Sequence, residues 1–441
     1  MPRPDTLRDA TLNSGASLLG RHGSARLADM GRVVDADLSG ASVLLRTDDQ
    51  LFAALALIEL DGVAARIVIA PPDVKAEHLP AVIERAGITV MVGENSGVDG
   101  VRFERLHLPV PGAAVAPTRK TEWVLFTSGT TGIPKMVAHT LEGLTGAIQP
   151  GTTNDIINNI IWGTFYDIRR YGGLQILLRA LLGQASLILS DAGEDVADFL
   201  ARLGRHGVTH LTGTPSHWRR ALMSPANAAI NPRYVRLSGE TADQAILDSL
   251  KARFPDAAMG HAYASTEAGV GFEVTDGLEG FPASFIGRPG PVEMKIENGT
   301  LHVRSPRAAS EYIGGGALQN GGWVDTTDMI EQRGDRCHFA GRTGGIINVG
   351  GLKINPEEVE AIINRHPGVR ASRVSGRKSP ITGAIVIADV VLSDAANDNA
   401  TFKDSILAAC REKLPAFKVP AMLRFVPKLE LTAGGKLSRN A

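Results

Sequence analysis

Between residues 40 and 290, apolar residues follow two different patterns. Short apolar runs predict buried strands, and stretches with apolar residues every three or four positions predict the helices between them. The predicted strands are Ile67–Ala70, Ile88–Val92, Ser186–Ser190 and Val208–Thr212, and the predicted helices are Gln50–Leu60, Leu79–Arg85 and Val196–Leu203. Strands that alternate with helices are typical of a mostly parallel sheet covered on both faces. We therefore predict a large N-terminal α/β body.

The pattern changes to strict alternation near Gly290. Met294 and Ile296 alternate with charged residues, and Asn298-Gly299 is a strong two-residue hairpin signal. A second hairpin is expected at Gly334-Asp335. This pattern predicts a small antiparallel β-subdomain over about residues 288–341.

The residues after Arg342 have their own succession of patterns. The predicted elements are strands at Ile346–Val349 and Ala384–Leu392, a helix from Pro356 that is capped by Asn355 and ends at His366-Pro367-Gly368, and a helix between Phe402 and Leu414. We expect an N-terminal domain over residues 1–342 and a small, mobile α+β C-terminal lobe over residues 343–441.

Composition excludes several kinds of partner. The chain of 441 residues has 46 lysines and arginines and 47 aspartates and glutamates, so its formal charge is −1. It has no net positive field for nucleic acid or for an anionic membrane surface. Its two cysteines form no metal-ligand pattern with histidine, and no apolar run suits a secretion signal or a membrane span. We expect a cytoplasmic protein that is not inserted in a membrane.

The segment most specific for chemistry follows the apolar run Trp123–Phe126. Hydroxyl residues and glycines precede a lysine in the order Thr127, Ser128, Gly129, Thr130, Thr131, Gly132, Ile133, Pro134, Lys135. Glycines let successive backbone amides converge on one point, hydroxyls add donors and the lysine adds positive charge, which suits a polyphosphate. The spacing is not that of a Walker A loop. A plain glycine-threonine turn after a strand is the alternative.

This loop resembles the phosphate loop of the adenylate-forming superfamily of acyl-CoA synthetases, peptide-synthetase adenylation domains and firefly luciferase. Further segments resemble that superfamily in the expected order over about residues 121–439: the adenine-pocket segment Arg236-Leu237-Ser238-Gly239-Glu240, the aromatic-Gly-x-Thr-Glu motif at Tyr263-Ala264-Ser265-Thr266-Glu267, the Thr-Gly-Asp motif at Thr326-Thr327-Asp328, and the closing lysine motif at 432–439. Ala264 and Thr327 stand where the superfamily usually has glycine.

The resemblance implies a role for each candidate residue. Tyr263 would stack on the purine, Asp328 would accept the ribose hydroxyls, and Thr266 would donate to the α-phosphate. Glu267 would help to hold Mg²⁺, and Lys436 would be the catalytic lysine of the mobile tail. The remaining cofactor-binding candidates are Ser238, Gly239, Glu240 and Arg342. Plain alternatives are a turn acid for Asp328, an interdomain ion pair for Arg342 and a solvated tail residue for Lys436.

The activity that the resemblance implies is an AMP-forming ligase. A small carboxylic acid would react with ATP to give an acyl adenylate, and the C-terminal lobe would then rotate just after Arg342 to admit a thiol, that of CoA. Gly344 stands where the superfamily has aspartate or lysine at this hinge, and Gly350-Gly351-Leu352 is the expected face toward the thiol. The alternatives are an enzyme that loads an amino or aryl acid onto a carrier-protein phosphopantetheine, and a non-catalytic nucleotide- or acyl-binding relative.

The pocket for the acid is expected around Phe165, Tyr166 and Asp167, with His217 on a second wall. In amino-acid-activating members an aspartate in this region pairs with the substrate ammonium. Asp167 has an alternative partner in the two arginines that follow it. His217 is expected to be a hydrogen-bonded structural histidine rather than a base.

Overall fold

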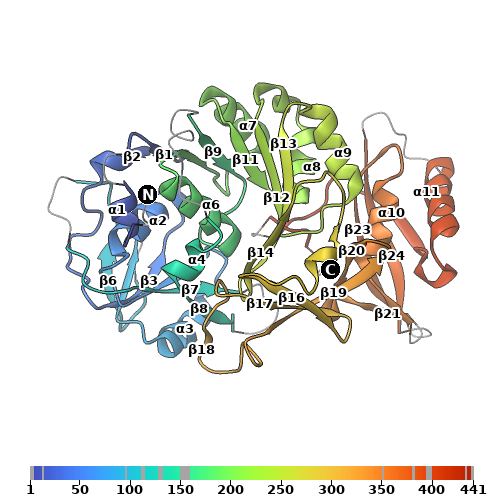
Figure 1. Ribbon diagram of the computed structural model, residues 1–441. Coiled ribbons are helices and arrows are strands. Elements are labelled where there is room, and N and C mark those ends of the chain that lie inside the picture. Colours follow the sequence, from blue (N-terminus) through green and yellow to red (C-terminus); the bar gives the residue numbers. More distant parts are fainter. Residues whose placement is uncertain are drawn as a thin grey trace.

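The computed structural model describes residues 4–11, 14–94, 97–110, 115–127, 133–148, 159–349, 352–379, 383–393, 400–432 and 435–438. These residues form two large sheets with helices, a small antiparallel sheet and a C-terminal lobe, which confirms the predicted fold class. In Figure 1 the two large sheets lie in the blue and green parts, and the lobe is orange and red. No helix in the described ranges has the length and apolar character needed to cross a bilayer.

The first large sheet carries the hydroxyl-rich segment. Its strand order is β18-β8-β7-β4-β3-β5-β6. The bounds are β3 Ser42–Arg46, β4 Arg66–Ala70, β5 Val90–Gly93, β6 Arg102–Arg105, β7 Glu122–Phe126, β8 Met136–Thr140 and β18 Glu311–Ile313. Strands β3 to β7 run parallel, with helices α2 (Gln50–Leu60) and α3 (Leu79–Ala86) between them, and β8 returns antiparallel to β7.

The second large sheet has the order β14-β13-β12-β11-β9-β10-β1-β2. The bounds are β1 Ser17–Leu19, β2 Ser24–Arg26, β9 Ile161–Thr164, β10 Ser186–Leu189, β11 His210–Gly213, β12 Tyr234–Ser238, β13 Ala258–Ser265 and β14 Gly269–Val274. Helices α6 (Tyr171–Leu182), α7 (Val196–Arg205), α8 (Pro215–Met223) and α9 (Gln244–Arg253) connect its strands. Because β9, β11 and β12 are parallel, the residues that follow them, Phe165, Thr214 and Gly239, meet at one edge of the sheet.

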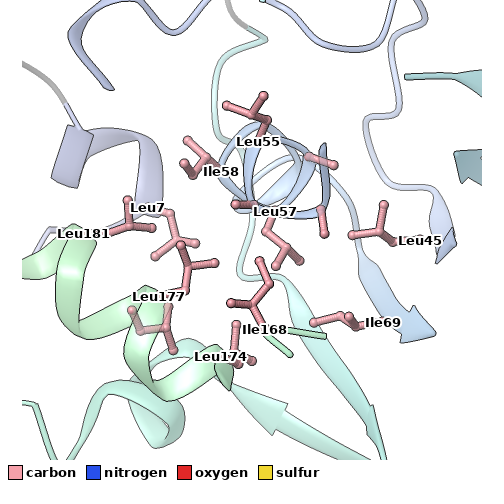
Figure 2. Close-up of a cluster of buried hydrophobic side chains, with 14 of the residues drawn as sticks. Leu7, Leu45, Leu55, Leu57, Ile58, Ile69, Ile168, Leu174, Leu177 and Leu181 are labelled. Carbon is pink, nitrogen blue, oxygen red and sulfur yellow. The ribbon is translucent and has the colours of Figure 1, made fainter. Parts of the chain in front are cut away.

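The sequence predicted one mostly parallel sheet for the body, whereas the structure has two large sheets. Helix α2 explains how they pack together. Ten of its eleven residues are buried, and a helix that is apolar on all sides belongs inside a protein rather than on its surface. Figure 2 shows Leu57 and Ile58 of α2 near Leu174 and Leu177 of α6, and one buried cluster contains side chains of these helices and of both sheets.

The predicted β-subdomain is a five-stranded antiparallel sheet with the order β15-β20-β19-β17-β16. Its strands are β15 Phe281–Pro282, β16 Glu293–Glu297, β17 Thr300–Arg304, β19 Val324–Arg333 and β20 Arg336–Arg342. Both predicted hairpins are confirmed. Asn298 and Gly299 have φ values of 52° and 81°, and Gly334 has a φ of 62°, as tight hairpin turns require.

The C-terminal lobe has its own buried cluster, drawn from residues 347 to 423. Its elements are β21 Ile347–Val349, β22 Leu352–Ile354, α10 Pro356–Asn364, β23 Val369–Ser379, β24 Gly383–Leu392, α11 Ala400–Lys413 and β25 Met422–Phe425. Two details differ from the prediction. Asn355 stands at the N-cap of α10 without a side-chain cap bond, and α10 ends at Asn364, before His366-Pro367.

Candidate active site

A cleft of about 1610 Å³ is lined by residues of both the body and the C-terminal lobe. Fourteen of the residues predicted from sequence line it: Thr127, Phe165, Tyr166, Asp167, His217, Ser238, Gly239, Glu240, Tyr263, Thr266, Glu267, Asp328, Arg342 and Lys436. They come from segments that are far apart in the sequence, and the fold brings these fourteen residues together around one space.

The hydroxyl-rich segment connects β7 to β8. The Thr127 amide donates to the Lys135 carbonyl at 2.9 Å, which closes the loop at its base. The predicted residues Ser128, Gly129, Thr130, Thr131 and Gly132 lie outside the described residues. The Lys135 ammonium lies 5.4 Å from the centre of the Tyr312 ring, and Lys135 is not among the lining residues of the cleft.

Asp328 is the polar centre of the β-subdomain side of the cleft. Its Oδ2 accepts a hydrogen bond from the Tyr263 hydroxyl at 2.6 Å, and its Oδ1 accepts one from Arg342 Nε at 2.7 Å. Burial, reinforced by the Asp328 charge, raises the pKa of Tyr263 well above its usual value. Each carboxylate oxygen has a second lone pair, so Asp328 can hold these two residues and still accept a hydroxyl.

Thr327, which stands where the superfamily usually has glycine, has a left-handed backbone. Its φ is 59°, in the left-handed region that a β-branched residue rarely adopts. The neighbouring Thr326 is buried, and its hydroxyl donates to the Leu301 carbonyl at 2.7 Å. The left-handed backbone at residue 327 therefore places strain directly beside Asp328.

Thr266 and Glu267 form the turn from β13 to β14. His139 of β8 lies with its Nε2 2.8 Å from the Thr266 carbonyl, and the Ala309 amide donates to the Glu267 carbonyl at 2.9 Å. Burial lowers the pKa of His139 to about 4, so the ring is neutral at pH 7 and Nε2 carries the proton that it donates. The Glu267 carboxylate borders the cleft and has no hydrogen bond or ion pair to another described residue.

Lys436 reaches the cleft because the tail turn docks on the body. The Thr214 hydroxyl donates to the Gly435 carbonyl at 2.8 Å, and the Leu437 amide donates to Glu240 Oε1 at 2.7 Å. The Lys436 Cε lies 3.5 Å from the position that a Cβ on Gly239 would take. Burial lowers the pKa of Lys436, and the Arg342 charge acts in the same direction.

The predicted acid pocket has an aromatic wall. The Phe165 and His217 rings are stacked with centres 5.5 Å apart, and the Tyr166 hydroxyl donates to the Ser238 carbonyl at 2.9 Å. The two Asp167 oxygens accept from Arg169 Nε and Nη2 at 2.7 and 2.9 Å, and Arg169 is buried. The ion-pair alternative for Asp167 is therefore the arrangement found.

His217 has the structural role that was predicted. It forms a capping box at the start of α8, in which its amide donates to the Thr214 hydroxyl and its Nδ1 accepts from the Thr214 amide. Burial lowers the pKa of His217 to about 3, so the ring is neutral at pH 7. A neutral ring whose Nδ1 is already an acceptor is a poor candidate for a general base.

Comparison with known families agrees with this geometry. A family model described as AMP-binding enzyme matches residues 38–313, and one described as AMP-binding enzyme C-terminal domain matches residues 358–436. The chain belongs to the AMP-binding enzyme family. The two matched ranges fall on either side of Arg342, which lines the cleft.

Individual AMP-binding enzymes are similar over nearly the whole chain. The 2-succinylbenzoate–CoA ligase of Salmonella typhimurium is 27% identical over 419 residues, which cover 91% of this chain and 86% of that protein. The o-succinylbenzoate CoA synthetase of Bacillus subtilis, solved with the acyl-adenylate intermediate OSB-AMP, has a TM-score of 0.73 at 19% identity and covers 99% and 97% of the two chains. The anthranilate CoA ligase AuaEII, solved with anthranoyl-AMP, has a TM-score of 0.76 at 17% identity and covers 99% and 96%. At these identities the two structures show a shared fold.

Sequence reasoning missed the residues that join the body to the lobe, and it missed His139. Asn364 of the lobe donates to Asp243 at 3.2 Å, Arg365 pairs with Glu279, and Thr214 binds the tail. The dipeptide Thr214-Pro215 predicts the start of a helix, because threonine suits the N-cap and proline the first helical position. Its partner in the tail lies 221 residues away, and no local pattern identifies such a partner.

Proposed function

We propose that this chain is an AMP-forming ligase that activates a carboxylic acid with ATP and transfers the acyl group to the thiol of CoA. The observation that carries the proposal is the docking of the tail. It puts Lys436 in the same cleft as Thr266, Glu267, Asp328 and Arg342, which is the arrangement that adenylate formation requires. The similarity to 2-succinylbenzoate–CoA ligases, over 91% of the chain in one of them, supports CoA as the acceptor.

In the first step a carboxylate oxygen attacks the α-phosphorus of ATP, and the bond to the β-phosphate oxygen breaks to release pyrophosphate. Negative charge grows on the phosphate oxygens during this step. Lys436 supplies a positive charge there, the Thr266 hydroxyl donates, and the backbone amides of the predicted loop Ser128 to Gly132 would bind the departing phosphates. One well-placed donor of this kind changes the rate by about 100-fold to 1000-fold.

The Glu267 carboxylate suits Mg²⁺. It borders the cleft without a partner among the described residues, and those residues contain no group of three or more potential metal-binding side chains. Mg²⁺ characteristically binds one or two carboxylates together with substrate phosphates. When bound there, the ion would neutralise phosphate charge.

The nucleoside is assigned to the β-subdomain side of the cleft. The ribose hydroxyls would use the free lone pairs of Asp328, whose other contacts fix Tyr263 and Arg342. The Tyr263 ring would lie against the adenine, and Ser238 and Gly239 would border it at the end of β12.

In the second step the thiol sulfur attacks the acyl carbonyl and AMP leaves. We place the domain boundary at Arg342, with residues 1–342 as the body and 343–441 as the moving lobe. The turn Thr343–Gly345 follows directly, and a Cβ on Gly344 or Gly345 would meet no atom within 4 Å. There is therefore open space on the side of each residue where a side chain would stand. Leu352 of the expected thiol-facing segment is exposed, and Gly350 and Gly351 lie outside the described residues.

The structure makes an amino acid a less suitable substrate. The bidentate bond from Arg169 occupies the carboxylate of Asp167, which was the sequence feature that favoured amino-acid loading onto a carrier protein. The Phe165 and His217 rings stack on each other and give this part of the cleft an aromatic lining without a free carboxylate. An acid without an α-ammonium group, such as an aryl acid, fits this surface better.

The test is a panel of aryl, aliphatic and amino acids, scored by pyrophosphate release with ATP and Mg²⁺, in the presence and absence of CoA. We expect release with a subset of acids and an acyl-CoA product when CoA is added. Adenylate formation followed by transfer only to a carrier-protein phosphopantetheine would show that the acceptor is the carrier protein and not CoA. ATP binding without release for any acid would support a non-catalytic relative.

A further inference from the structure

Glu240 joins the body to the catalytic tail through both of its carboxylate oxygens. Oε2 accepts from the Ser216 amide at 2.9 Å, and Oε1 accepts from the Leu437 amide at 2.7 Å. Ser216 lies in the first turn of α8 (Pro215–Met223), where unpaired amides and the helix dipole favour a negative charge. The carboxylate is therefore anchored on the body before it receives the tail.

A second bond holds the other side of the same turn. The buried Thr214 hydroxyl donates to the Gly435 carbonyl at 2.8 Å. The two contacts thus grip the residues immediately before and after Lys436. Asn364 with Asp243 and Arg365 with Glu279 also join the lobe to the body, and these contacts are made by residues near the end of α10 and not by the tail.

We propose that Glu240 is a positioning residue that holds the backbone after Lys436 and so fixes the lysine in the cleft for adenylate formation. This role differs from the adenine-pocket role implied by family resemblance, because both oxygens are engaged by backbone amides. The inference rests on the proposed function. The contact crosses between the body and the lobe, so it must break when the lobe rotates for the thiol step. Glu240 therefore stabilises the pose for adenylate formation and opposes the rotation of the lobe that the thiol step needs.

The main test is Glu240→Gln, which keeps the shape but replaces one acceptor oxygen with an NH₂ group that faces a backbone amide. Hydrogen bonds to charged groups are strong, so we expect acid-dependent pyrophosphate exchange to fall by about 10-fold to 100-fold. Thioester formation from supplied acyl adenylate should be unchanged or faster. Equal losses in both half-reactions, or no loss in exchange, would overturn the proposal.

Glu240→Asp provides a second variant that retains the charge. Its shorter side chain cannot span from the Ser216 amide to the Leu437 amide, so the same selective loss of exchange is expected. The matched control is Glu279→Gln, which removes a carboxylate that also joins the body to the lobe but does not touch the tail turn. We expect it to change exchange by less than about 3-fold, because exposed pairs contribute little.

A double-mutant cycle with Lys436→Ala shows whether Glu240 acts through the lysine. In the Lys436→Ala background, Glu240→Gln should change the residual exchange by less than about 2-fold. An undiminished effect would mean that Glu240 acts directly on the nucleotide and would overturn the proposal. If the wild-type protein exchanges no pyrophosphate with any acid, the proposed function itself fails. A wild-type enzyme that exchanges, with an equally active Glu240→Gln variant, rejects the positioning role alone.

Discussion

Gly435 of the tail lies so close to His217 of α8 that a Cβ on residue 435 would overlap the imidazole Cε1. Gly435 also has a left-handed φ of 71°, which L side chains rarely adopt. The tail can therefore contact α8 and place Lys436 in the cleft only because residue 435 is glycine.

Gly435→Ala should impair the adenylate-forming pose selectively. We expect acid-dependent pyrophosphate exchange to fall by about 10-fold or more, since steric overlap and backbone strain each cost free energy. Thioester formation from supplied acyl adenylate should remain within about 2-fold of wild type, because the docked tail is not used in that step. Adding His217→Ala should restore part of the exchange, since it removes the overlap but not the strain. Unchanged exchange in Gly435→Ala would contradict the docking geometry.

Thr327→Gly should stabilise the protein. The exposed Thr327 side chain has a φ of 59°, and glycine removes the strain of a β-branched residue in this region, a gain of about 1 kcal/mol after the entropy of glycine is set against it. Urea unfolding measures this gain. Asn298→Gly is the matched control with a φ of 52°, and its gain should be smaller because asparagine tolerates this conformation better. A destabilised Thr327→Gly variant would refute the strain at this position.

Much of the fold could be predicted because its signals are local. The hairpins at Asn298-Gly299 and Gly334-Asp335 follow from turn chemistry and form at the predicted residues. Helix α2 has the predicted bounds, Gln50–Leu60, although it is buried on all sides. The division of the strands between two sheets was not predictable, since alternation identifies strands but not their neighbours. Helix α10 ends at Asn364, close to the predicted stop at His366-Pro367-Gly368, because Pro367 disfavours the helical region for the residue before it.

The candidate site was predictable residue by residue but not in its internal contacts. The motifs named Asp328, Tyr263 and Arg342 separately, and the fold joins them through one carboxylate. The grip of Glu240 on the tail and the bond from His139 to Thr266 depend on side chains that meet only after folding. Long-range pairs of this kind leave no spacing in the sequence.

The buried Asp61 should make stability depend on pH. Its carboxylate accepts from the Leu7 amide at 2.9 Å and from Trp123 Nε1 at 3.2 Å, and burial raises its pKa from 3.8 to about 6. The folded state therefore holds this proton more tightly than the unfolded state. The contribution of Asp61 is most favourable at low pH and is lost as the pH rises toward 6.

Asp61→Asn removes this titration. The unfolding free energy of the variant minus that of wild type should rise by roughly 2 kcal/mol between pH 4 and pH 7, as measured by urea unfolding at several pH values. Asp99→Asn, at an exposed carboxylate, should show a much smaller change. A difference between Asp61→Asn and wild type that is independent of pH would contradict the raised pKa.

Gly344→Pro should restrict the hinge. Proline fixes its own φ, so it removes backbone freedom at the middle residue of the turn Thr343–Gly345, where the lobe is proposed to rotate. We expect thioester formation to slow by about 10-fold, with a much smaller effect on pyrophosphate exchange. Gly344→Ala, which meets no atom within 4 Å, is the control and should retain both half-reactions. Equal losses in the two half-reactions of the proline variant would remove the hinge assignment.

Isotope exchange of labelled pyrophosphate into ATP tests most directly whether the tail lysine and the body form one site for adenylate formation. The wild-type enzyme should show exchange that requires a carboxylic acid and Mg²⁺ but not CoA. Lys436→Ala should lower that exchange by at least about 100-fold while still forming thioester from supplied acyl adenylate. Exchange at the wild-type rate in Lys436→Ala, or no exchange by the wild-type enzyme with any acid of a broad library, would contradict a shared site for adenylate formation.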